Sequence, residues 1–356
     1  MRGLGTSVAC LLLLSAFVPG VVGEDHRDPF APCMSPSTTV AMEKLVLTYP
    51  DEEVHGCIAS PADDATSVET LVVFAHGLGW SVQAGWLGHM AEVVDRAPGT
   101  AVVATNYRDN FGFPVLAGAE DTVRATQIAL DRFPDVERTI LLGVSMGGAV
   151  SGTAIHIAPS MNDGEGLYDT WFDLEGVSNL FETYTEARAV GLGIPFAADV
   201  ADAIERDAGG TPAEAPSAYH LRSPALNAQA MADAGLQEVV VVHGVNDGLV
   251  PYNQGHEMAK AAAAAGLPVE VHTITRTEEG QTAGTTPTGH ALSPEDDPNE
   301  QYLHLAGHAS EGDRGHPVMD VGLERLISLL DGEAVQTGYT GAVHDTAASA
   351  SFGAGA

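Results

Sequence analysis

Short runs of apolar residues recur along the central part of the chain, and turn-forming residues bound most of them. A continuous apolar run of this length is typical of a strand that is buried on both faces of a sheet. An alternating stretch over 44–48 predicts a further strand at a sheet edge. The predicted buried strands are residues 71–75, 100–105, 139–144, 238–242 and 269–274, with another near Trp171 and Phe172.

Stretches with apolar residues at helical spacing lie between these strands. A proline or glycine follows several of them, as expected at helix ends. Strands that alternate with helices indicate an α/β protein with a doubly wound, mostly parallel sheet. The predicted helices are residues 83–95, 117–132, 146–158, 256–265 and 317–330.

Two regions interrupt this alternation. Residues 179–236 have helical patches without a buried strand, which predicts a helical cap inserted into the main domain. Residues 277–299 are rich in Gly, Thr, Pro and acidic residues, and they predict a long surface loop. Residues 334–356 are rich in Ala, Gly, Thr and Ser, and we expect a flexible tail there. The main domain is therefore predicted over 24–333.

The N-terminal residues have the organisation of a targeting segment. A positively charged start precedes an apolar run over 8–18, which Pro19 and Gly20 end. A small residue, Gly23, lies at the expected cleavage point. We therefore predict a signal peptide over 1–23, a secreted or periplasmic protein, and no stable membrane insertion once the peptide is removed. An uncleaved anchor is the alternative, although the run is short for a bilayer span.

Two cysteines follow this segment, Cys33 and Cys57. Export to an oxidising compartment favours a disulfide between them. Such a bond would tie the mature N-terminus to the first strand region. A pair of buried free thiols is the alternative.

The chain is strongly acidic. It contains 48 Asp and Glu against 15 Lys and Arg, which gives a formal net charge of −33. Such a surface repels nucleic acid and anionic membranes, so we expect neither as a partner. Only Lys44 and Lys260 are lysines, and an acid-rich, lysine-poor composition resembles that of salt-adapted proteins.

Ser145 is the candidate nucleophile. It lies in the segment 143–147, Gly-Val-Ser-Met-Gly, which has the pattern G-x-S-x-G between a predicted buried strand and a predicted helix. A sharp turn at that point exposes the serine, and the glycines permit a crowded backbone. The helix N-terminus also presents N–H groups and a positive dipole end to a developing oxyanion.

These residues resemble the nucleophile turn of the α/β-hydrolase superfamily, and the resemblance extends over about 71–330. It implies a serine hydrolase, of the esterase or lipase kind, that forms an acyl-enzyme at Ser145. A His-Gly-Leu-Gly segment over 76–79 follows the first buried strand, where this superfamily places an oxyanion donor. The resemblance therefore implies an oxyanion hole made by the backbone N–H groups of Leu78 and Met146. The histidine of that segment is expected to have a structural role.

The resemblance also indicates the acid of a catalytic triad. Residues 244–251 have the arrangement G-x-x-D-x-x-V-P after a late strand, which is similar to the acid turn of the superfamily. A carboxylate there accepts the imidazole N–H and stabilises the imidazolium. Asp247 is the candidate acid, and Asp173, one strand earlier, is the alternative.

The resemblance further implies that the catalytic base follows the acid and precedes the last helix. His308 follows a glycine at the spacing typical of the superfamily, and it is the candidate base. His316 abuts the start of the last helix and is the alternative base, although we expect it to cap that helix. His290 and His304 also satisfy the order and stay open.

No metal-ligand or phosphate-binding motif accompanies these residues, so we expect no metal and no cofactor. The leading hypothesis is hydrolysis of carboxylic esters, on a small-molecule or lipid substrate, by a Ser-His-Asp triad. A peptidase or amidase on the same scaffold is the first alternative. A non-catalytic binding protein that kept the fold is the second, because fold alone does not fix function.

Overall fold

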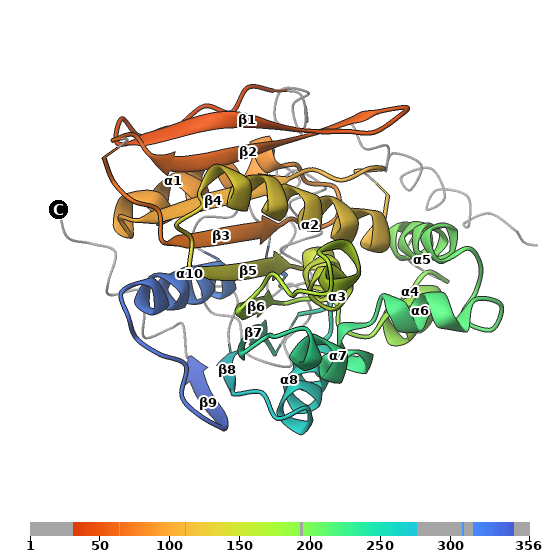
Figure 1. Ribbon diagram of the computed structural model, residues 1–356. Helices are drawn as coiled ribbons and strands as arrows, with labels where there is room; N and C mark the ends of the chain where they lie inside the picture. The colour runs from red at the N-terminus through yellow and green to blue at the C-terminus, as the bar shows by residue number, and fades with distance from the viewer. Residues whose placement is uncertain are drawn as a thin grey trace, which may run out of the picture.

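A nine-stranded sheet forms the middle layer of the protein in the computed structural model (Figure 1). The structure describes residues 31–63, 65–110, 112–192, 195–245, 247–275, 308–309 and 316–344. The strands lie in the order β1-β2-β4-β3-β5-β6-β7-β8-β9. Their bounds are β1 (Val40–Thr48), β2 (Glu53–Pro61), β3 (Thr70–Ala75), β4 (Thr100–Thr105), β5 (Arg138–Val144), β6 (Thr170–Leu174), β7 (Glu238–Gly244), β8 (Val269–Ile274) and β9 (Tyr339–His344).

Most of the sheet is parallel. Each pair of neighbours from β4 to β9 is parallel, whereas β2 runs antiparallel to both of its neighbours, β1 and β4. The predicted α/β class with a doubly wound, mostly parallel sheet is therefore confirmed. Parallel strands end at the same edge of a sheet, so the loops that follow β3, β5, β6 and β7 meet there.

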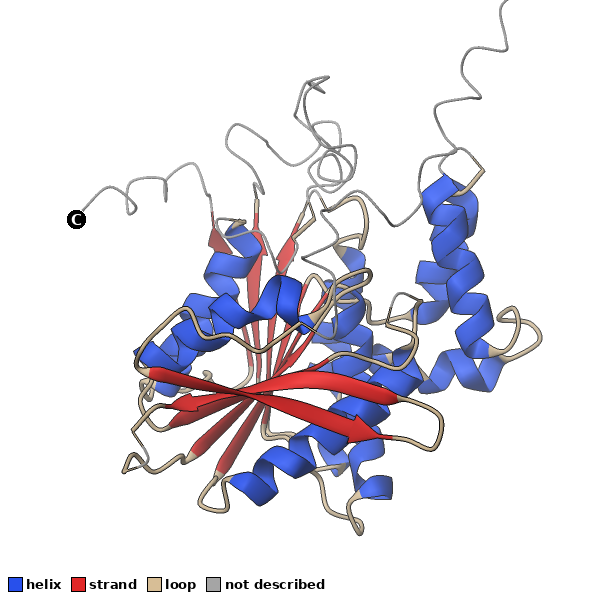
Figure 2. Cartoon of the chain, turned by 90° about the horizontal axis from the view of Figure 1, so that it is seen from above, coloured by secondary structure: helices blue, strands red, loops and turns tan. Residues whose placement is uncertain are grey.

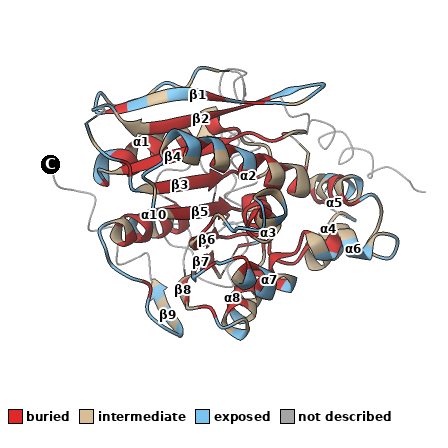
Figure 3. Cartoon of the chain, viewed as in Figure 1, coloured by how far each residue is buried: buried red, intermediate tan, exposed pale blue. Residues whose placement is uncertain are grey.

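The central strands are apolar because helices cover both of their faces. Every residue of β4 is buried, and Figure 3 shows the buried strands at the centre of the molecule. Successive side chains point to opposite faces, so neighbouring residues enter different cores. Val73 packs with the core on one face and Val72 with the core on the other.

Helices flank the sheet on both sides (Figure 2). One face packs against α1 (Leu87–Arg96), which a π-helical turn over Val82–Trp86 precedes, and against α10 (Pro317–Leu330). The opposite face packs against α2, α3 and α8. These three helices span Val115–Arg132, Met146–Met161 and Asn253–Ala264. All five predicted helices are present, with ends that differ by a few residues.

The region predicted as a cap contains helices α4 (Leu180–Val190), α5 (Pro195–Ala208), α6 (Pro216–Leu221) and α7 (Ala228–Asp233). Helices α4, α5 and α6 lie beyond the carboxyl ends of the parallel strands (Figure 1). A third apolar cluster joins them to the start of α3 and includes Met146, Leu180, Ile204 and Tyr219. Helix α7 instead returns to pack against α3 and α8.

A disulfide joins Cys33 to Cys57 of β2, as predicted. Strand β9 is a correction to the flexible tail expected over 334–356, because it pairs with β8 at the sheet edge. The signal peptide and the loop predicted over 277–299 lie outside the described residues, as do residues 345–356. Among the helices that the structure describes, none combines the length and apolar content of a membrane span.

Candidate active site

The turn between β5 and α3 holds Ser145 in an uncommon backbone conformation, with φ +57° and ψ −125°. A non-glycine residue at such angles costs about 1–3 kcal/mol, so its surroundings must hold it. The Ser145 N–H donates to the carbonyl oxygen of Leu174 at 3.1 Å, and its own carbonyl accepts from Val177 N at 3.0 Å. The end of β6 thus fixes the turn from one side.

The flanking glycines are required by close backbone contacts. A Cβ on Gly143 would lie 2.2 Å from the carbonyl oxygen of Gly147. A Cβ on Gly147 would lie 2.2 Å from the carbonyl oxygen of Ala75, at the end of β3. The G-x-S-x-G pattern therefore lets α3 start directly against the strand ends, with Ser145 at the apex.

The residues predicted as oxyanion donors, Leu78 and Met146, line the same cavity as this serine. Met146 is the first residue of α3, and Leu78 belongs to the loop after β3. The neighbouring His76 is fully buried, and its ring nitrogens lie 2.8 Å from the Gly77 carbonyl oxygen and 3.0 Å from Asn110 Oδ1. Burial lowers the pKa of His76 to about 4, so the ring is neutral at neutral pH. These contacts suit a structural role for His76.

Asp247 lies in the turn after β7, and both of its carboxylate oxygens are engaged. Oδ1 accepts the backbone N–H groups of Leu249 at 2.8 Å and Val250 at 2.9 Å. Oδ2 lies 2.6 Å from His308 Nδ1. The carboxylate is therefore oriented before any substrate binds, which is the arrangement that fixes an imidazole tautomer.

The alternative acid, Asp173, is fully buried within β6. Neither of its carboxylate oxygens has a hydrogen-bond partner among the described residues. Burial raises the pKa of Asp173 to about 7. The structure thus places Asp247, and not Asp173, against the imidazole.

His308 is buried, and it lines the same cavity as Ser145. Because Nδ1 faces Asp247, Nε2 is the ring nitrogen that transfers the proton in a triad of this kind. His316 occupies a different place, at the start of α10, where its Nδ1 accepts the Val318 N–H at 3.4 Å. It is absent from the cavity lining, which agrees with the expected cap. His290 and His304 lie outside the described residues.

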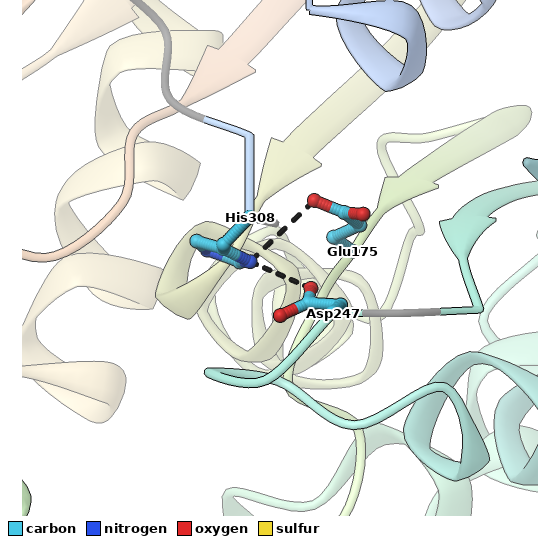
Figure 4. A group of neighbouring side chains, drawn as sticks. All are labelled: Glu175, Asp247 and His308. Atoms are coloured by element: carbon cyan, nitrogen blue, oxygen red, sulfur yellow. Dashed lines mark hydrogen bonds and ion pairs between the residues drawn. The ribbon is translucent and has the colours of Figure 1, made fainter. Parts of the chain in front are cut away.

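A second carboxylate, Glu175, was not predicted from the sequence. It directly follows β6, has φ +48°, and is fully buried. Its Oε2 lies 3.4 Å from His308 Nδ1, so two carboxylates face one imidazole nitrogen (Figure 4). The signal in the sequence is an acidic residue at the carboxyl end of a buried strand, and Asp173, two residues earlier, carries the same signal.

The three residues of this cluster could in principle approach a metal ion, since their ligand atoms lie within 4.8 Å of one another. The carboxylate oxygens, however, accept backbone N–H groups, and Nδ1 faces Asp247 Oδ2. The backbone N–H groups around Glu175 and Asp247 thus occupy carboxylate oxygens that a metal ion would need as ligands. This arrangement suits proton transfer better than cation binding.

A cavity of about 310 Å³ opens above Ser145. Most of its wall comes from helices α4 and α5, the loop after β3 and the turn after β7. Among the described lining residues, the ionisable side chains are those of His308 and Glu186. Burial, and then the nearby Glu182, raise the pKa of Glu186. The apolar side chains of the wall are Leu78, Trp80, Phe113, Met146, Val177, Ala187, Val190, Phe196, Ala197, Val200, Leu249, Val250, Pro251 and Ala309.

Comparison with known proteins places this geometry in context. The model of the prolyl oligopeptidase family matches residues 117–280, a range that contains Ser145 and Asp247 and ends before His308. No curated protein matches the chain. The chain is 18% identical to an acylaminoacyl peptidase from Pyrococcus horikoshii, with a TM-score of 0.49, over 66% of this chain and 37% of that one. It therefore spans little more than a third of that peptidase.

Two similar structures are matched over most of their length. Carboxyl esterase 2 from the fungus Tuber melanosporum has a TM-score of 0.57 at 16% identity, over 87% of this chain and 92% of that one. An esterase from Rhizomucor miehei has a TM-score of 0.55 at 16% identity, over 82% and 83%. With its mostly parallel sheet and its serine at the turn between β5 and α3, this chain has the α/β-hydrolase fold.

Proposed function

We propose that this protein hydrolyses carboxylic esters through an acyl-enzyme, with Ser145 as nucleophile, His308 as base and Asp247 as acid. The observation that carries this proposal is the 2.6 Å contact between His308 Nδ1 and Asp247 Oδ2, beside a serine held at a strained turn in the same cavity. A base that a third group orients, next to a nucleophile, is the arrangement that activates a serine hydroxyl.

The proposed reaction has two halves. His308 Nε2 takes the proton of Ser145 Oγ as this oxygen attacks the ester carbonyl carbon, and the resulting oxyanion faces the N–H groups of Leu78 and Met146. The imidazolium then gives its proton to the alkoxide as the carbon–oxygen bond of the ester breaks. Water attacks the acyl-enzyme with His308 again as base, and the carboxylic acid leaves with Ser145 restored.

The cavity wall supports an apolar acyl group of small or medium size. Its lining is mostly aliphatic and aromatic, and a buried methylene group contributes about 0.8 kcal/mol to binding. A small-molecule or lipid ester would place its acyl chain against α4 and α5 and its carbonyl carbon at Ser145.

A peptidase or amidase is the second candidate, and one observation favours it. The model that matches residues 117–280 is that of the prolyl oligopeptidase family. Cleavage of an amide uses the same residues but requires protonation of a poorer leaving group by His308.

The direct test compares p-nitrophenyl esters of increasing acyl length with p-nitroanilides of acylated amino acids and short peptides. We expect turnover of the esters with a preference for apolar acyl groups, and loss of roughly 10⁵–10⁶-fold in kcat for Ser145→Ala. Turnover of the anilides at a higher kcat/KM than that of the esters would favour the peptidase. Absence of turnover on both series, with no label on Ser145 from a fluorophosphonate, would favour a binding protein.

We also propose that the protein is exported. The disulfide between Cys33 and Cys57 supports this proposal, because such bonds persist mainly in oxidising compartments. Cell fractionation with N-terminal sequencing tests it. Export with a new N-terminus at Glu24 is the expected result, and a cytoplasmic protein that keeps Met1 would contradict it.

A further inference from the structure

Glu175 connects the two segments that carry the acid and the base. Its Oε1 accepts the N–H of Gly244, at the end of β7, at 3.0 Å. Its Oε2 accepts the N–H of Ala309, the residue after His308, at 2.7 Å. One fully buried side chain thus ties the end of β7 to the segment that carries His308.

The same carboxylate also faces the imidazole. Glu175 Oε2 lies 3.4 Å from His308 Nδ1, whereas Asp247 Oδ2 lies at 2.6 Å (Figure 4). Asp247 is therefore the hydrogen-bond acceptor, and Glu175 contributes a second charge beside the same nitrogen. A negative charge at this range favours the protonated ring, and low exposure strengthens the interaction.

We propose that Glu175 is a positioning residue for His308, which fixes the main chain beside the base and adds a second carboxylate charge that stabilises the imidazolium. This inference rests on the proposed function, because it assigns Glu175 to the base of that reaction. Neither the G-x-S-x-G pattern nor the acid turn includes Glu175, so it extends the Ser-His-Asp unit by one group.

The titratable groups around the imidazole come from three described places. Asp247 faces it from the turn after β7, and Glu175 faces it from the end of β6. His243 of β7 lies behind Asp247, with its Nε2 3.7 Å from Asp247 Oδ2. Burial lowers the pKa of His243, so it stays neutral and adds no charge. Burial, followed by Asp247, raises the pKa of Glu175 well above its ordinary value, whereas a positive charge on His308 and the N–H groups of Ala309 and Gly244 lower it. Because both oxygens accept these N–H groups, the carboxylate form of Glu175 accompanies the protonated ring of His308.

The first test is Glu175→Gln, with Asp173→Asn as the matched control. Asp173 belongs to β6, and Glu175 directly follows this strand. Both side chains are fully buried, and both substitutions convert a carboxyl group to an amide. Loss of the charge beside Nδ1 destabilises the imidazolium. The acid limb of the kcat/KM profile should therefore move down by about one pH unit in Glu175→Gln. A displaced base should also lower kcat by about 10²-fold with little change in KM.

Asp173→Asn should change neither quantity, because Asp173 does not contact the imidazole. A folded Glu175→Gln protein whose acid limb and kcat both match the wild type would overturn the proposal. An equal effect of both substitutions would also overturn it, because it would indicate a general response to changes in the buried strand.

A second variant covers the case in which Glu175→Gln does not fold. In Asp247→Asn, Glu175 is intact, and the ring titration of His308 can be followed by NMR without any substrate. Its signal is assigned by its loss in His308→Gln. If Glu175 stabilises the imidazolium, the midpoint should stay at or above about 6.5, the ordinary histidine value. A midpoint well below that value, as burial alone would produce, would contradict the proposal.

These outcomes separate this inference from the proposed function. A wild-type protein that cleaves no ester would contradict the proposed function, yet the NMR titration would still report on Glu175. Conversely, an active enzyme with a His308 midpoint well below about 6.5 in Asp247→Asn, or with an unaltered acid limb and kcat in Glu175→Gln, would contradict only the role of Glu175.

Discussion

The Cys33–Cys57 disulfide offers a prediction whose magnitude follows from the structure. The bond closes a loop across a sequence separation of 24 residues and anchors the segment before β1 to β2. In the chain-entropy model, a loop of this length stabilises the folded state by about 3.5 kcal/mol at 25 °C. An unfolding entropy of roughly 2.1 cal/mol/K per residue converts this value to a Tm decrease of about 5 °C on reduction.

The assay is thermal unfolding followed by circular dichroism, with and without dithiothreitol. Reduction leaves both side chains in place, so the change reports on the cross-link alone. The double variant Cys33→Ala/Cys57→Ala is the control, because its Tm should be low and should not respond to the reductant. A Tm of the wild type that is unchanged by complete reduction, verified by thiol counting, would refute the reasoning.

Three further predictions concern the site. Gly147→Ala should lower the free energy of unfolding by at least about 1–3 kcal/mol and reduce kcat, because the new Cβ meets the Ala75 carbonyl oxygen. A variant with the Tm and kcat of the wild type would contradict this prediction. His316→Ala should lower the free energy of unfolding by about 0.5–2 kcal/mol, because α10 loses its cap, and should leave kcat near the wild-type value. A loss of kcat as large as that expected for His308→Ala would instead identify His316 as the base. Glu186→Leu should raise the preference for an acyl chain longer by one methylene about four-fold, measured as a ratio of kcat/KM values, and an unchanged ratio would place the acyl chain elsewhere.

The sequence predicts the centre of this fold well because its strands are buried on both faces. Strands β3, β4, β5 and β7 appear as nearly continuous apolar runs, which are typical of a parallel sheet that is covered on both faces. Strand β9 has the opposite character, since its residues alternate between exposed and half-buried. Its pairing with β8 joins residues that are far apart in the sequence, so the local pattern of residues does not predict it.

The site residues also differ in whether local or long-range contacts determine them. Ser145 and Asp247 lie in turns whose local geometry demands particular residues, such as the glycines around Ser145. Glu175 is different, because its contacts are with Gly244 and Ala309, 69 and 134 residues away. His308 is intermediate: the order of the residues narrows the choice of base, but only the fold brings one histidine to Asp247.

The central claim is that Ser145 and His308 act as one unit, and the rate of covalent labelling tests it most directly. The protein is treated with a fluorophosphonate, and the modified residue is identified by peptide mapping with mass spectrometry. We expect a single adduct on Ser145 in the wild type and in His316→Ala. In His308→Ala the labelling rate should fall by at least about 10³-fold, because the hydroxyl loses its base. An adduct on another residue, or equally fast labelling of Ser145 in His308→Ala, would contradict the account.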